Sequence, residues 1–173
     1  MNQTMRIAIS ACLLGQNVRY DGKNKLQAWL ESVDDIEWIP ICPEVEAGMP
    51  VPREKIQLEL VEGELKLRAI VSRKDWSEKM DIVAAQWIEQ LQLQQVCGYV
   101  FKSRSPSCGV HGVPVFAGVD QRAVTQGQGR FAQRVSEAVP ALPLFEETQM
   151  DNAIERQEFI RRAWQFHQRN HDD

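Results

Sequence analysis

The sequence predicts an α/β domain of three layers, in which helices cover both faces of a mostly parallel sheet. Short apolar segments with the composition of buried strands alternate along the chain with longer segments that have the apolar period of an α-helix. This alternation is typical of parallel sheets, because the crossover between parallel strands is usually a helix. A chain of 173 residues is long enough for one substantial core, and we expect a single domain over residues 1–173.

The strand segments are short and lie between turn-forming residues. Two of them flank Glu62-Gly63-Glu64 and predict a hairpin. The others alternate with helical segments, as the strands of a parallel sheet do. In chain order the predicted strands are residues 6–10, 36–41, 57–60, 65–71, 96–101 and 141–145.

The helical segments are recognised by apolar residues that fall on one face. In the first we expect Leu26 on the inner face, and in the second Ser77 at the N-cap. In the last we expect Ile154 to face inward and Glu158 to pair with Arg162 one turn later. The predicted helices are residues 24–32, 77–95, 130–138 and 148–168.

The charge of the chain narrows the choice of partners. A net charge of −4 and an isoelectric point near 5.5 argue against binding of nucleic acid polymers or an anionic membrane. The polar N-terminus leads into only a short apolar run, so we expect no signal peptide, and no run has the length of a transmembrane helix. These features predict a cytoplasmic protein.

The cysteines are the most informative residues, because thiols of a cytoplasmic protein are more often free, catalytic or metal-bound than paired. Cys12, Cys42 and Cys108 each follow the carboxyl end of a predicted strand. Ligands of open parallel sheets bind at that edge, so three thiols far apart in sequence are expected to meet there. Cys97 lies within a predicted strand, away from turn residues, and is expected in the core.

The loop before Cys108 is built for rigidity. Ser105 precedes a proline and is restricted to extended conformations, while Pro106 fixes its own φ and has no N–H. Gly109 can adopt backbone conformations that other residues avoid. Such a loop suits a thiol that must be held in one place.

Several motifs together resemble the thiouracil desulfidase family, which was long catalogued as a domain of unknown function. The resemblance runs from about residue 7 to residue 129, and the ordered set of motifs is specific. The motifs are Ser10-Ala11-Cys12-Leu13-Leu14-Gly15, Val18-Arg19-Tyr20-Asp21-Gly22, Cys42-Pro43-Glu44, Pro52-Arg53 and Ser105-Pro106-Ser107-Cys108-Gly109.

The resemblance implies a Rossmann-like fold and a [4Fe-4S] cluster held by Cys12, Cys42 and Cys108. It also implies catalytic roles for Glu44 and Ser105 in removing sulfur from a thiolated nucleobase such as 2-thiouracil. Three thiolates leave one iron of a cubane open, and a thiocarbonyl sulfur is a suitable soft ligand for it. Water would then replace the sulfur on the ring carbon, and the sulfur would leave as hydrogen sulfide.

The residues alone leave other interpretations open. His111 follows Cys108 with ligand-like spacing and could complete a Cys₃His zinc site in a structural or interaction module. It could also act as the base for a cysteine nucleophile. Glu44 could instead cap a helix or pair with Arg53.

Two further segments have modest interpretations. Arg19, Asp21 and Lys25 could contact substrate, although a solvated turn is the simpler interpretation, and Gly127 and Gly129 relieve a tight helix start. Residues 110–118 depart from the family pattern and are expected to form part of the pocket wall.

Overall fold

The computed structural model describes residues 4–119 and 122–171 and confirms the α/β architecture with a parallel sheet. The first sheet has the order β2-β1-β5-β8, and each pair of neighbouring strands is parallel. Its strands are β1 (Met5–Ser10), β2 (Ile36–Ile41), β5 (Tyr99–Phe101) and β8 (Leu144–Glu146). Each of them falls on a predicted strand, although β5 is shorter than expected.

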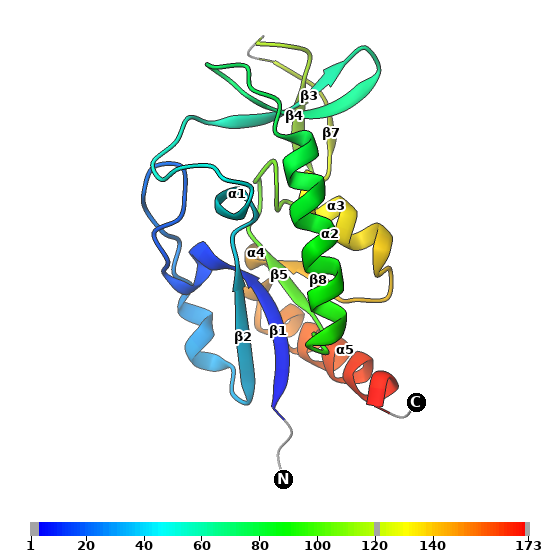
Figure 1. The fold of residues 1–173 in the computed structure, drawn as a ribbon. Coiled ribbons are helices and arrows are strands. Elements are labelled where there is room, and N and C mark those ends of the chain that lie inside the picture. Colours follow the sequence, from blue (N-terminus) through cyan, green and yellow to red (C-terminus); the bar gives the residue numbers. More distant parts are fainter. Residues whose placement is uncertain (1–3, 120–121, 172–173) are drawn as a thin grey trace.

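A second sheet lies beyond the carboxyl ends of β1 and β2, at the upper end of the molecule in Figure 1. It has the order β4-β3-β6-β7, with parallel pairing between β3 and β6 and antiparallel pairing elsewhere. The predicted hairpin forms as β3 and β4, whereas the other two strands were not predicted. The strands are β3 (Ile56–Val61), β4 (Glu64–Ala69), β6 (Val113–Phe116) and β7 (Ala123–Gly127).

The unpredicted strands lack the usual sequence signals. β6 contains Pro114, which removes a donor from the ladder, and β7 is exposed along most of its length. Residues 110–118 are expected to form part of the pocket wall, but none of them is in the described lining of the pocket, and Val113–Phe116 build β6. β7 has no buried face, so its sequence shows no alternation of apolar and polar residues.

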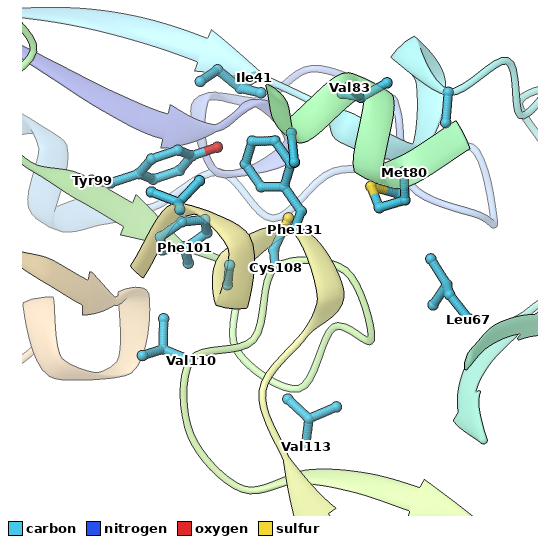
Figure 2. Close-up of a cluster of buried hydrophobic side chains, with 14 of the residues drawn as sticks. Ile41, Leu67, Met80, Val83, Tyr99, Phe101, Cys108, Val110, Val113 and Phe131 are labelled. Atoms are coloured by element: carbon cyan, nitrogen blue, oxygen red, sulfur yellow. The ribbon is translucent and has the colours of Figure 1, made fainter. Parts of the chain in front are cut away.

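Helices cover both faces of the first sheet and form the expected outer layers. On one face Tyr99 and Phe101 pack with Met80 of α2 (Ser77–Leu93) and Phe131 of α3 (Arg130–Ala138), as the close-up in Figure 2 shows for part of this cluster. On the other face the apolar residues of β1 pack with the 3₁₀ helix η2 (Ala28–Ser32) and with α5 (Ala153–His171). The shorter helices are η1 (Ala11–Leu14), α1 (Pro43–Glu46) and α4 (Glu147–Met150). None of the described helices combines the length and the apolar character that a membrane span needs.

Several helix details differ from the sequence expectations. The segment 24–32 forms only η2, and Leu26 is 64% exposed because it precedes that turn. Trp76, not Ser77, is the N-cap of α2, since the Ser77 hydroxyl oxygen accepts a hydrogen bond from the Leu67 N–H at 2.9 Å.

The last predicted helix is divided into α4 and α5. Ile154 lies in the first turn of α5 and is 78% exposed, so the expectation that it faces inward is wrong. Glu158 pairs with Arg161, whose Nε donates at 2.8 Å, and not with Arg162. Arg162 instead lies over the ring of Phe145.

The amino end of α3 is attached to the loop that carries Cys108. The N–H groups of Gly129, Arg130 and Ala132 donate to the carbonyls of Gly109, Pro106 and Ser107 at 2.7, 2.9 and 3.1 Å. These are backbone donors that a helix terminus leaves without partners of its own. A Cβ at position 129 would lie 2.5 Å from the carbonyl carbon of Ser107, so only glycine permits this approach.

Because of this close approach, we expect alanine to destabilise the protein more at position 129 than at position 127. Gly129→Ala should lower the free energy of unfolding by about 1–3 kcal/mol, because the added methyl overlaps backbone that cannot move cheaply. Urea unfolding of the apoprotein, followed by circular dichroism, measures the change.

Gly127→Ala is the matched control two residues earlier. A Cβ there meets Val115 Cγ2 at 3.5 Å, which is ordinary contact, so the change should stay under about 1 kcal/mol. Equal effects of the two substitutions would contradict the steric account.

Candidate active site

The carboxyl ends of β1, β2 and β5 border a pocket of about 670 Å³. Cys12, Cys42 and Cys108 all line it, so the structure brings together the three thiols that the sequence placed at strand ends. Glu44 and Ser105 line the same pocket. The predicted convergence is therefore present.

Each thiol is positioned by a turn that starts where a strand stops. Cys12 lies in η1, which follows β1 directly and ends at Gly15 in the left-handed conformation, with φ of 91°. Cys42 is the N-cap of α1, and Pro43 fixes the first helical residue after it. Cys108 lies in the loop between β5 and β6 and is 5% exposed.

The electrostatics of the thiols disfavour three thiolates in the protein alone. Burial raises the pKa of Cys12, Lys102 opposes this shift and Cys42 adds to it, so that the pKa stands at about 11. Burial likewise raises the pKa of Cys42, and raises that of Cys108 well above its ordinary value, with Glu44 adding to both shifts. A positively charged group bound between the sulfur atoms would relieve this cost.

Ser10, at the end of β1, is a hydrogen-bond partner of Cys108. Its buried hydroxyl oxygen accepts a hydrogen bond from the Lys102 N–H at 2.9 Å. The hydroxyl proton is then left to donate, and a hydrogen bond from Ser10 to Cys108 lowers the pKa of that thiol. Sequence analysis gave Ser10 no role, because a serine at a strand end has no distinguishing pattern.

Ser105 has a structural task in addition to any chemical one. Its hydroxyl oxygen accepts hydrogen bonds from the N–H groups of Ser107 and Cys108, at 3.2 and 3.0 Å. Its carbonyl accepts from the Gly109 N–H at 2.8 Å. Ser105 therefore orients the backbone of Cys108, and its hydroxyl proton stays available to an acceptor in the pocket.

Glu44 pairs with Arg53, one of the alternatives that the sequence left open. Arg53 Nε lies 3.1 Å from Glu44 Oε1, and both side chains are mostly buried. The same guanidinium donates to the carbonyl oxygens of Val18 and Pro50 at 2.7 and 3.2 Å. Arg53 thus holds the carboxylate at the pocket and ties α1 to the loop after β1.

The described lining of the pocket is strongly basic. Glu44 is its acidic side chain, whereas the basic ones are Arg19, Lys25, Arg53, Lys55, Lys102 and Arg104. Arg19 and Lys25 therefore lie at the pocket, where they can contact a substrate, and are more than parts of a solvated turn. Asp21 is not part of the described lining, and its Oδ2 lies 3.9 Å from Nη1 of Arg19.

Lys102 is held in place by an acidic side chain and by a backbone carbonyl. Its ammonium lies 2.9 Å from Glu147 Oε1 and donates to the Ser103 carbonyl at 2.9 Å. Glu147 is buried and also accepts from the Ser103 N–H and hydroxyl, both at 2.6 Å. No local pattern in the sequence marks this group, because its members come from segments that only the fold brings together.

Two other side chains lie outside the described lining. Cys97 is 1% exposed and its sulfur contacts the Arg6 carbonyl at 3.3 Å, which confirms that it belongs to the core. His111 is exposed, and among residues 4–119 and 122–171 there is no group of three or more His, Cys, Asp or Glu side chains that could hold a metal ion. The described residues therefore do not form the Cys₃His arrangement.

Comparisons with known proteins agree with this geometry. A protein of Bacillus subtilis (strain 168) named "Uncharacterized protein YbbK" is 27% identical over 110 residues, which cover 60% of this chain and 72% of that protein. The solved structure of the [4Fe-4S]-dependent thiouracil desulfidase TudS is similar with a TM-score of 0.66 and 29% identity, and the match covers 84% of this chain and 92% of that one. The family described as 2-thiouracil desulfurase matches residues 7–147. This chain belongs to the 2-thiouracil desulfurase family.

Proposed function

We propose that the protein is a [4Fe-4S]-dependent desulfidase that replaces the sulfur of a thiolated uracil by oxygen. The observation that carries the proposal is the convergence of Cys12, Cys42 and Cys108 on one pocket in a chain of this family. The similarity to TudS, whose name states the same cofactor and activity, supports it. The free thiols of all four cysteines suit the reducing cytoplasm in which we place the protein.

The donor set fits such a cluster. Cysteine sulfurs are the ligands that iron–sulfur clusters prefer, and a cationic centre between Cys12, Cys42 and Cys108 would favour the thiolates that burial disfavours. A four-iron cluster is wider than a single ion, so its thiolates lie farther apart than those around one zinc. When bound, the cluster supplies an open iron that acts as a soft Lewis acid toward the thiocarbonyl sulfur.

Glu44 is the side chain best placed to move a proton. Its carboxylate lies at the pocket and is held there by Arg53 at 3.1 Å. A base at this position would take a proton from the water that attacks the ring carbon and pass it on, by way of a ring nitrogen, so that both protons of the water finally leave with the sulfur as hydrogen sulfide. Position and anchoring, both set by Arg53, are what this role requires.

Ser105 and the basic lining complete the site. The Ser105 oxygen already accepts hydrogen bonds from two backbone N–H groups, so its proton points to an acceptor on the substrate or on the water. The anchored ammonium of Lys102 and the guanidinium of Arg19 stabilise negative charge that develops on the ring. The net reaction consumes one water, breaks the carbon–sulfur bond, forms a carbon–oxygen bond and releases hydrogen sulfide.

The ligand assignment predicts different iron contents for two cysteine variants. Cys108→Ser should lose most of the cluster, because a neutral hydroxyl replaces a thiolate. Cys97→Ala should keep the cluster and lose about 1 kcal/mol of stability, the cost of a small core cavity. Iron and sulfide analysis after anaerobic reconstitution, with the visible spectrum, measures both outcomes.

Wild-type protein should be brown, with a broad absorption near the blue end of the visible range. Colourless protein with stoichiometric zinc would sink the proposal. Loss of iron from Cys97→Ala, with the other three cysteines intact, would show that the ligand set is wrong.

The role of Glu44 predicts a loss of turnover without a loss of iron. Glu44→Gln keeps the size of the side chain and an oxygen for Arg53, but it removes the basic carboxylate. Hydrogen sulfide release from a thiolated uracil should fall by about 10²–10⁴-fold, the usual contribution of a general acid–base group.

Glu46→Gln is the matched control on the same helix. Glu46 accepts a hydrogen bond from Trp87 Nε1 at 2.7 Å and is not part of the described lining, so this variant should turn over normally. Wild-type turnover by Glu44→Gln would reduce Glu44 to a structural partner of Arg53.

A further inference from the structure

The hydroxyl of Tyr99 is the most conspicuous polar group that the proposed reaction does not use. Tyr99 lies in β5, in the middle of the first sheet, and is 0% exposed. Its hydroxyl oxygen has no hydrogen-bond partner among the described residues. Buried hydroxyl groups almost always have a partner, so this one indicates an acceptor that the polypeptide does not supply.

The ring of Tyr99 is held in one orientation. It stacks on Phe101 with centroids 3.7 Å apart and planes 4° apart, and it meets the ring of Phe131 edge to face at 6.2 Å. The backbone N–H donates to the Pro143 carbonyl at 2.9 Å. The hydroxyl group therefore cannot reach solvent by rotation of the side chain.

The oxygen points to the side of the ring on which Cys108 lies. Figure 2 shows it directed into the interior, on the side where Cys108 and Phe131 lie. Burial raises the pKa of Tyr99 far above its ordinary value, and the negative charges that raise it further belong to Cys108, Cys42, Glu46 and Cys12, in that order. The group thus stays protonated and can act as a donor.

Glu46 is the protein acceptor to consider first. Its Oε2 already accepts from Trp87 Nε1 at 2.7 Å, and no hydrogen bond joins it to Tyr99 among the described residues. Sulfur held by the three thiols is the other negative centre near the hydroxyl. Hydrogen bonds to cluster sulfur atoms are among the factors that set the reduction potential of an iron–sulfur centre.

We infer that the Tyr99 hydroxyl donates a hydrogen bond to a sulfur atom of the cluster held by Cys12, Cys42 and Cys108, an inference that rests on the proposed function. Tyr99 lies on the interior side of the thiols and does not line the pocket as described. Its bond stabilises the more negative, reduced form of the cluster and helps to retain the cluster. Tyr99 is therefore a donor to the cofactor and has no proton-transfer role in the reaction.

The test is Tyr99→Phe, which keeps the ring and removes only the hydroxyl. The apoprotein variant should unfold at the same or a higher temperature than wild type, because it loses a buried donor without a partner. The reconstituted variant should have a more negative reduction potential and should release iron to a chelator about 10-fold more readily. Electron–nuclear double resonance of the reduced cluster should lose one coupling to a proton that exchanges in D₂O.

Phe159→Leu is the control for a change in core packing. Phe159 is fully buried against Phe145 in the other apolar cluster, so this variant should be less stable but keep the wild-type potential and proton coupling. An unchanged potential, iron release and coupling in Tyr99→Phe would overturn the inference while leaving the proposed function intact. Failure of wild-type protein to bind any iron–sulfur cluster would overturn both.

Discussion

The attachment of α3 to the Cys108 loop is the interaction on which the rest of the site depends. Three N–H groups at the start of the helix bind three carbonyls of the loop, and Gly129 allows the two backbones to approach. Within the same loop, the hydroxyl and carbonyl oxygens of Ser105 accept hydrogen bonds from the N–H groups of Cys108 and Gly109. The loop is therefore fixed by hydrogen bonds of its backbone with α3 and with Ser105, none of which uses the sulfur of Cys108.

The second constraint is electrostatic. Three thiols, of which Cys12 and Cys108 are buried, converge with the carboxylate of Glu44 where strands end, and each negative charge makes the others more costly. Cations from separate loops offset part of this cost. Of these, Arg53 lies 3.1 Å from Glu44 and Lys102 lies 2.9 Å from Glu147. Such a site gains most of its stability from what it binds, because the protein charges alone only partly compensate one another.

Sequence analysis reached the parts of the molecule that have strong local patterns. The strands that precede Cys12, Cys42 and Cys108 are apolar runs with turns after them, and the edge rule for parallel sheets then placed the thiols together. It did not reach β6, which is short and contains a proline, β7, which has no buried face, or most of the basic lining beyond Arg19 and Lys25. It also missed Tyr99, since an unpartnered hydroxyl is visible only when its surroundings are known.

The buried contact between Glu147 and the pair Lys102–Ser103 has a consequence for the order of assembly during synthesis. Glu147 follows β8, late in the chain, and α3 also lies in the last third. On a ribosome, a nascent chain that has exposed all of its cysteines still lacks the helix and the carboxylate that hold their loops. The loop of Cys108 can therefore reach its final arrangement only after the chain up to Glu147 has emerged.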